Sequence, residues 1–186
     1  MKPLPLIALS ILMLASAAIF AQSEAQKPEA TKPPVNPLSD YTRHVYDGVQ
    51  KVLLRSAEKM PEENYNFKPT DTVRSYGQVL GHVADAQYLF CSIALGEKNP
   101  TPKIEQTKTS KADLMAALKD AFAYCNKAYD AMTDATAAQP LSLFGREAPR
   151  LGVLSVNTMH SVEHYGNLVT YMRLKNIVPP TSEQQK

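Results

Sequence analysis

Apolar residues recur every three or four positions in four stretches of this chain, the spacing that gathers side chains on one side of an α-helix. The first stretch begins near Ser39-Asp40. It ends before Pro61, because proline removes a backbone donor that a continuing helix needs. Its expected inward stripe consists of Tyr41, Val45, Val49 and Val52. The pattern predicts a first helix of roughly 20 residues.

Capping residues delimit the next two helices. Ser75 and Gln78 have the spacing of a capping box, in which each side chain bonds the other residue's backbone amide, and Gly96 is a natural terminator. Ser110 caps the third helix, which is expected to continue to the break at Pro140. The expected inward residues are Val79, His82, Ala86, Leu89 and Ile93 in the second helix and Leu114, Leu118, Ala121, Cys125 and Met132 in the third.

The fourth stretch runs from about Leu151 to Lys175. Asn176 tolerates the left-handed conformation that ends many helices, and Pro179-Pro180 prevents further extension. Only 7 glycines are present, and the chain lacks hairpin signals and long runs of alternating polarity. The pattern therefore predicts an all-α fold, a four-helix bundle.

The connections leave the order of the helices open. The 13 residues between Gly96 and Ser110 reach about 43 Å when extended, whereas a 20-residue helix is about 30 Å long. The third helix can therefore start at the same end of the bundle as the second. The segment from Pro140 to Arg150 permits the same course. Both a bundle with a long crossover and a simple up-down-up-down order are compatible with these lengths.

Three of the four histidines lie on the predicted inward stripes. His160 and His164 are four residues apart and stack on one helix face, and His82 lies on the apolar face of the second helix. Three neutral imidazoles from two helices suit zinc and related metals and leave a fourth position open. The alternative is a set of hydrogen-bonded structural histidines, but each buried ring then needs its own partners. His44 lies off the apolar stripe and is expected to be solvated.

The start of the chain has the pattern of an export signal. An apolar run from Leu4 to Phe20 follows a basic residue and ends in small residues, with cleavage expected after Ala18 or Ala21. The run is at the short limit for a membrane-spanning helix. We therefore expect residues 1–21 to be a secretory signal peptide and the protein to be periplasmic or extracellular, without a stable membrane anchor after cleavage.

Composition then divides the remaining chain. Residues 22–37 are rich in Pro, Lys, Glu and Ala and predict a disordered linker, residues 38–182 form the bundle, and residues 183–186 are a polar tail. Removing residues 1–21 leaves 165 residues, enough for one domain. With 20 basic against 18 acidic residues in the full chain, no electrostatic footprint for nucleic acid is present.

The two cysteines, Cys91 and Cys125, are candidates for a disulfide in an exported protein. They lie 16 and 15 residues beyond the caps of their helices, so parallel helices would bring them to the same depth. Against a bond, Cys91 lies about 180° around the helix from His82 and so faces away from the bundle centre. Two buried thiols that behave as small apolar residues are the alternative.

Two blocks of this sequence resemble the DinB family (DinB/YfiT-like). Residues 64–69 (NYNFKP) with 74–85 (RSYGQVLGHVAD) are similar to its first half, and residues 160–173 (HSVEHYGNLVTYMR) with 177–180 (IVPP) to its second. The resemblance covers residues 39–182. It implies an up-down-down-up bundle in which a helix-two histidine and an HxxxH pair bind one divalent metal, often zinc or nickel. These roles fall on His82, His160 and His164.

Two classes of function remain. In the first, the protein is a metal-dependent hydrolase or transferase of an unknown small molecule, and the open metal position takes water, a thiolate or a carbonyl group. Asp85, one turn from His82, is then the candidate for a hydrogen-bond partner behind that metal ligand or for a proton acceptor. Glu163 points away from His164 and is a weaker candidate. In the second, the bundle binds a metal or small ligand without chemistry. Haem through His or Met ligands and a homodimer are compatible with the sequence, but nothing specifies either.

Overall fold

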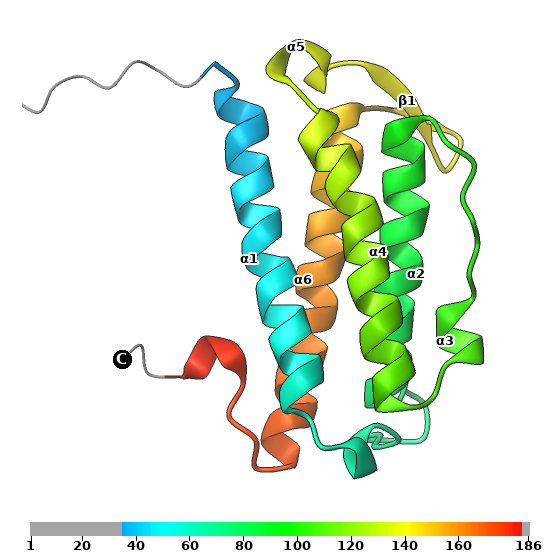
Figure 1. Cartoon of the computed structure of the whole chain (residues 1–186), viewed down its shortest axis with the longest axis vertical. Coiled ribbons are helices and arrows are strands. Elements are labelled where there is room, and N and C mark those ends of the chain that lie inside the picture. Colours follow the sequence, from blue (N-terminus) through cyan, green and yellow to red (C-terminus); the bar gives the residue numbers. More distant parts are fainter. Residues whose placement is uncertain (1–34, 184–186) are drawn as a thin grey trace, which may run out of the picture. The chain divides into compact units, whose positions relative to one another are not determined.

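The computed structural model describes residues 35–183. Within them, four long helices lie side by side: α1 (Pro37–Lys59), α2 (Tyr76–Leu95), α4 (Lys111–Ala131) and α6 (Arg150–Leu174). In Figure 1, α1 and α6 run downward whereas α2 and α4 run upward. The fold is the expected all-α bundle with up-down-down-up order. The predicted signal peptide and residues 22–34 of the predicted linker lie outside the described residues.

The predicted caps set the helix ends. Ser75 Oγ accepts from the Gln78 amide and Gln78 Oε1 accepts from the Ser75 amide, which is the reciprocal capping box. Ser110 caps α4 by accepting from the amide of Asp113. Gly96 ends α2 with φ 72°, and Asn176 follows α6 with φ 59°. Local sequence therefore decides where these helices begin and end, as expected.

The connection between α2 and α4 is a long crossover, since these two helices are parallel (Figure 1). It carries a one-turn helix, α3 (Ile104–Thr107), which the sequence did not predict. This short helix packs on α2 at Gly81, where an added Cβ would lie 2.7 Å from Glu105 Cα. A glycine is required here because any side chain would collide with the backbone of α3.

The connection between α4 and α6 is local, as the up-down-down-up order requires, but the predicted end of the third helix at Pro140 was wrong. The α4 helix ends at Ala131, because Thr133 caps a separate short helix, α5 (Asp134–Ala137), instead of continuing to Pro140. A hairpin follows, with β1 (Pro140–Leu143) paired to β2 (Arg146–Pro149). Its turn residues, Phe144 and Gly145, have φ values of 52° and 78°. Two positive φ values fit a tight hairpin turn, which keeps the connection local.

The buried stripe of α1 differs from the predicted one. Tyr41 and Val45 are 70% and 38% exposed, whereas Tyr46 and Leu53 are fully buried. The stripe includes Tyr46 because its hydroxyl donates to Gln87 Oε1 and its ring stacks on another tyrosine ring, so that its polar end is satisfied inside the core. By contrast, all five residues predicted to face inward from the third helix are buried, four of them in α4 and Met132 at its C-cap.

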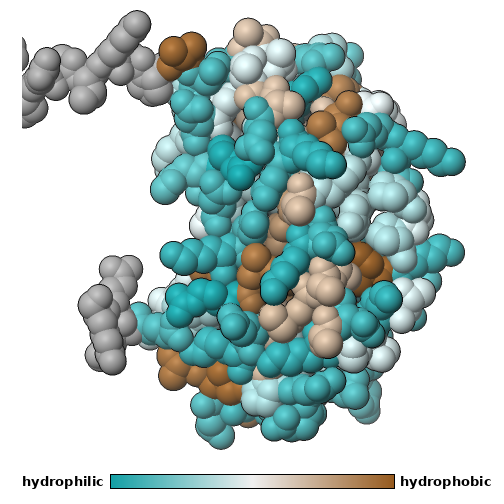
Figure 2. All heavy atoms as spheres, viewed as in Figure 1, coloured by the Kyte–Doolittle hydropathy of each residue, from teal (hydrophilic) through white to brown (hydrophobic). Residues whose placement is uncertain are grey.

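The described surface is largely polar. The face drawn in Figure 2 is mainly hydrophilic, with apolar side chains in small groups between polar ones. No helix of residues 35–183 is long and apolar enough to cross a membrane. Two 3-10 turns complete the described fold, η1 (Glu62–Asn64) and η2 (Pro180–Ser182). Glu183, assigned from the sequence to the polar tail, forms ion pairs with Arg55 and Lys59 and so lies against α1.

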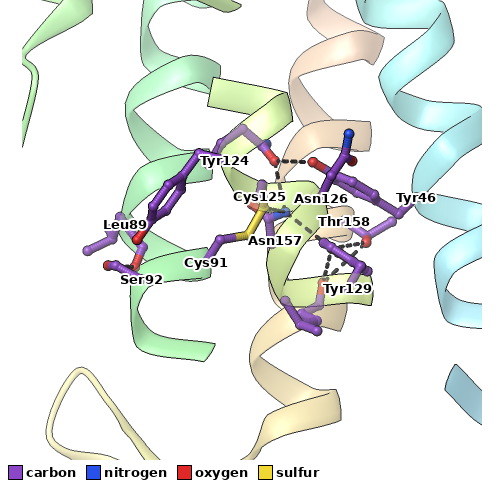
Figure 3. The surroundings of a disulfide bond; sticks show 12 residues. Tyr46, Leu89, Cys91, Ser92, Tyr124, Cys125, Asn126, Tyr129, Asn157 and Thr158 are labelled. Carbon is purple, nitrogen blue, oxygen red and sulfur yellow. Dashed lines mark hydrogen bonds between the residues drawn. A yellow bond between two sulfur atoms is a disulfide. The ribbon is translucent and has the colours of Figure 1, made fainter. Parts of the chain in front are cut away.

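A disulfide joins Cys91 of α2 to Cys125 of α4 (Figure 3). Their Cα atoms are 5.1 Å apart, and both residues are fully buried. The parallel course of α2 and α4 brings the two cysteines to the same depth. The angular argument against the bond fails because α2 lies between two partners, with His82 directed to α6 and Cys91 to α4.

Candidate metal centre

The structure brings His82, His160 and His164 together between α2 and α6. His160 Nε2 lies 3.1 Å from His82 Nε2 and 3.2 Å from His164 Nε2. The three ligand atoms all lie within 4.8 Å of one another. The HxxxH spacing places two rings one turn apart on α6, and antiparallel packing of α2 supplies the third.

His82 is oriented by an acidic residue that the sequence did not reveal. Its Nδ1 atom lies 3.1 Å from Glu105 Oε2 on α3. A carboxylate is an acceptor only, so Nδ1 carries the proton in a neutral His82 and Nε2 keeps its lone pair. That lone pair faces the other two histidines. A carboxylate behind a histidine is a common arrangement around protein-bound metals.

Asp85, the residue expected to partner His82, has a different position. Its carboxylate accepts from the backbone amides of Ile104 and Glu105, at 2.8 and 3.0 Å. The prediction was wrong because Asp85 holds the α3 backbone and reaches His82 only through Glu105. Gly81 supports the same contact by letting α3 approach α2. Glu105 lies 23 residues beyond His82 in a segment without helical periodicity, so spacing could not identify it.

The other two rings differ in their surroundings. His164 Nδ1 lies 3.3 Å from Asn167 Nδ2, and the Asn167 amide can present either its oxygen or its nitrogen to the ring. His160 Nδ1 is buried and has no hydrogen-bond partner within residues 35–183. The His160 ring lies 5.7 Å from the ring of Phe90 in an edge-on arrangement. Packing on Phe90 therefore fixes the orientation of His160.

The environment keeps two of the rings neutral. Burial is the largest cause that lowers the pKa of His160, and together with the neighbouring His164, His82 and Arg74 it brings this pKa to about 4. Burial also lowers the pKa of His164, again with help from His82 and Arg74. Neutral imidazole is the form that binds a metal. Burial costs little free energy when the imidazole rings are neutral and much more when they are protonated, because the charged form loses its hydration.

Two of the three donor separations match those around a metal ion, and all three donor atoms lie within 4.8 Å of one another. Ligand distances of 2.0–2.1 Å place neighbouring nitrogens about 3.3 Å apart in a tetrahedral site and about 2.9 Å apart in an octahedral one. The observed 3.1 and 3.2 Å lie between these values. With all three rings neutral, at most one of the two contacts at His160 Nε2 can be an N–H···N hydrogen bond, and the other opposes two lone pairs unless a cation lies between them. The lowered pKa values of His160 and His164 disfavour an additional proton there.

The centre opens to a cleft of about 520 Å³. The cleft is lined by His164 and other residues of α6, by the loop before α2, by the start of α2 and by α3. Its polar lining consists of Thr72, Arg74, Gln78, Glu105, Asn167 and Tyr171. A cleft of this size accommodates a small molecule, so a ligand there can reach His164, which lines the cleft.

Comparison with known proteins identifies the family. The sequence pattern of the DinB superfamily matches residues 46–168, which include all three histidines. The chain belongs to the DinB superfamily. A relative described as "Uncharacterized protein YjoA", from Bacillus subtilis (strain 168), is 27% identical over 130 residues, covering 67% of this chain and 82% of the relative.

Solved structures show the same fold. A DinB-like protein from Bacillus cereus superposes with a TM-score of 0.68 at 16% identity, covering 76% of this chain and 95% of that one. The DinB-like protein YjoA of Bacillus subtilis gives 0.63 at 22% identity, with 78% and 99% covered. A mycothiol-dependent maleylpyruvate isomerase gives 0.56 at 14% identity, with 70% and 59% covered. At such low sequence identity, these superpositions show that the fold is shared and say nothing of the chemistry of this chain.

Proposed function

We propose that this protein binds one divalent metal ion, zinc or nickel, through the Nε2 atoms of His82, His160 and His164. The observation that carries the proposal is the convergence of three ring nitrogens, with 3.1 and 3.2 Å between neighbours, in the absence of any carboxylate among them. An all-imidazole set suits borderline metals such as zinc and nickel better than magnesium or calcium, which prefer oxygen.

The cleft favours a catalytic role over a purely structural one. A structural metal site is closed by four protein ligands, whereas three histidines leave a position for a substrate group. A bound ion would supply Lewis acidity at that position. We therefore propose a metal-dependent hydrolase or transferase that acts on a small molecule. One neighbour of the same fold is a mycothiol-dependent maleylpyruvate isomerase, which supports this fold as a scaffold for small-molecule chemistry.

The chain's own residues have distinct roles in this proposal. Glu105 holds His82 in the tautomer whose Nε2 is a donor to the metal. Phe90 orients His160 and excludes water from that side. Asn167 orients His164 at the cleft wall, where a substrate would enter. The metal centre is therefore closed on the core side and open on the cleft side.

Export is part of the same proposal. It rests on the signal-peptide pattern of residues 1–21, and the disulfide between Cys91 and Cys125 supports it, because such bonds persist in oxidising compartments. Cell fractionation with N-terminal mass analysis tests it. Recovery of a chain shortened at Ala18 or Ala21 outside the cytoplasm is the expected result, and an intact cytoplasmic chain would contradict export.

Elemental analysis tests the metal proposal. Protein purified without added chelator should carry one zinc or nickel ion per chain, and chelated protein should recover one equivalent in a calorimetric titration. A stoichiometry near zero under both conditions would contradict metal binding. If the loaded protein turns over no ester, amide, lactone or thiol adduct, the non-catalytic binding bundle becomes the better description.

A further inference from the structure

Arg74 stands beside the histidines and belongs to no described step of metal binding. It lies immediately before the cap of α2 and lines the same cleft as His164. Its charge is close enough to lower the pKa of both His160 and His164. A cation placed next to a cation site weakens that site unless an anion joins them. Glu105 joins Arg74 to His82 through the Nε side of the arginine, and the remaining donors of Arg74 are left for another anion.

The arginine is held in place before any ligand binds. Its Nε atom donates to Glu105 Oε1 at 2.8 Å, and its backbone carbonyl accepts from the hydroxyl of Tyr171 at 2.9 Å. The two contacts come from α3 and α6, on either side of the arginine. Preorganisation of this kind lowers the entropic cost of binding a ligand.

The outer edge of the guanidinium remains available. Within residues 35–183 its two Nη atoms form no hydrogen bond, and its side chain is 45% exposed. Two parallel N–H donors match the two oxygens of one carboxylate. Nearby, Gln78 uses its side-chain oxygen in the capping box, which leaves its amide donors facing the cleft. The wall therefore presents a group of donors.

From this arrangement we propose that the cleft contains a carboxylate-binding subsite centred on Arg74. The ligand of the metal centre is then a small organic acid with two anchors. One donor group occupies the open metal position and a carboxylate binds the Nη edge of Arg74. This inference rests on the proposed function and adds the substrate class.

Charge selects a carboxylate over a phosphate group. Glu105 neutralises the Nε side of Arg74 and lies in the same cleft, so a doubly charged phosphate group bound at Arg74 would meet more repulsion from Glu105 than a singly charged carboxylate group would. A singly charged planar group needs only the two free donors. The cleft volume of about 520 Å³ fits an acid of this kind.

Calorimetry on the zinc-loaded full chain tests the subsite. The probes are dicarboxylates from malonate to adipate, each compared with the monocarboxylate of equal carbon number. We expect one chain length to bind at least 10-fold more tightly than its monocarboxylate. Arg74→Gln should remove that advantage, because a charge-assisted bidentate contact contributes about 1.5–3 kcal/mol, or roughly 10- to 150-fold. Arg74→Lys should retain part of it.

A matched control separates charge from position. Arg146 is an exposed arginine of β2 that lines neither that cleft nor its neighbour, so Arg146→Gln should leave dicarboxylate binding unchanged. The zinc affinity and unfolding temperature of each variant are measured first. If Arg74→Gln disturbs either, the charge-retaining Arg74→Lys variant decides the matter by whether its dicarboxylate preference persists.

The outcomes separate the two proposals. Zinc uptake without any dicarboxylate preference, or a preference that survives Arg74→Gln, overturns the subsite and leaves the metal proposal intact. Failure to take up zinc overturns the metal proposal. The subsite is then judged on the metal-free protein, where dicarboxylate binding that Arg74→Gln abolishes supports it and absence of binding overturns it.

Discussion

Two polar clusters occupy neighbouring positions between α2 and α6, and their hydrogen bonding differs. The first, the buried polar network, consists of Tyr46, Gln87, Tyr129, Asn157 and Ser161. The second, the histidine cluster, consists of His82, His160 and His164. Gln87 lies five residues beyond His82 on α2, and Ser161 follows His160 on α6. Both clusters therefore draw residues from α2 and α6, and α1 and α4 add Tyr46 and Tyr129 to the first.

In the buried polar network, donors meet acceptors, except at Asn157 Oδ1, which is buried and has no hydrogen-bond partner within residues 35–183. Gln87 Oε1 accepts from Tyr46 and from Asn157, both at 3.0 Å, and Gln87 Nε2 donates to Ser161 at 2.9 Å. In the histidine cluster, His160 Nε2 lies close to the Nε2 atoms of both His82 and His164, so one ring N–H can satisfy only one of the two contacts, and the His82 side chain is 27% exposed. A largely satisfied cluster stabilises the fold by itself. An unsatisfied one that faces a cleft indicates a ligand.

The largest expected effect comes from the histidine cluster. The double substitution His160→Ala, His164→Ala removes two of three ligands and should weaken zinc binding at least about a thousandfold, or roughly 4 kcal/mol. The metal-free fold should persist, since its satisfied polar groups lie elsewhere. Competition with a chromophoric chelator measures the affinity. Zinc occupancy equal to that of the wild type would show that His160 and His164 are not the ligands.

The converse substitution addresses the buried polar network. Gln87→Met keeps the side-chain length but leaves the Tyr46 hydroxyl, the Asn157 amide and the Ser161 hydroxyl short of a partner. We expect a loss of about 2–4 kcal/mol in the free energy of unfolding, since each orphaned buried group costs about 1–3 kcal/mol. Urea denaturation measures the loss, and zinc affinity should hold. If Gln87→Met kept its stability but lost zinc binding, the buried polar network would serve the metal site and not the stability of the fold.

A smaller effect is expected where α3 meets the histidine cluster. Gly81→Ala places a methyl group 2.7 Å from Glu105 Cα, so α3 must move and Glu105 must release His82. We expect a loss of about 1–3 kcal/mol in stability and about 10- to 100-fold in zinc affinity.

Gly166→Ala is the matched control on α6. Its added Cβ meets nothing within 4 Å. This substitution should stabilise the protein by about 0.4–1 kcal/mol through the unfolded chain and leave zinc affinity unchanged. Equal zinc affinities in the two alanine variants would mean that Glu105 does not position His82.

The smallest expected difference between the two clusters is in how the stability of the metal-free protein depends on pH. Burial holds the pKa of His160 at about 4, whereas histidine in the unfolded chain titrates near 6.5. Below about pH 6.5 the unfolded chain therefore binds protons that the folded metal-free protein does not, and stability falls from there toward pH 4. Above pH 6.5 this contribution is constant. Urea midpoints should show a shallower acid slope for His160→Gln and an unchanged slope for Gln87→Met.

The helices and the three histidines were predictable because their signals are local. Capping residues such as Ser75 mark helix ends within a few positions, and four-residue spacing places His160 and His164 on one face. The antiparallel packing of α2 on α6 was then enough to bring His82 to them. The family resemblance supplied the order of the helices.

The sequence did not reveal the features that depend on contacts between distant segments. Glu105 reaches His82 only because Gly81 lets the α3 backbone approach α2. The residues that flank Glu105 and Gly81 in the sequence give no sign of this contact. The hairpin turn has Phe144 at its first positive-φ position, where glycine, asparagine or aspartate is usual. The stripe of α1 was misplaced because Tyr46 needs buried partners from α2 and α4.

The disulfide has a consequence for a chain cut in the crossover. Lys98 and Lys103 are exposed between α2 and α3, within the loop that Cys91 and Cys125 close. Trypsin acting there would divide the polypeptide into two fragments that stay covalently linked. The nicked protein should migrate as one species in non-reducing electrophoresis and as two after reduction. Because the cut leaves Asp85, Glu105 and the histidines on their own helices, the nicked protein should still bind zinc.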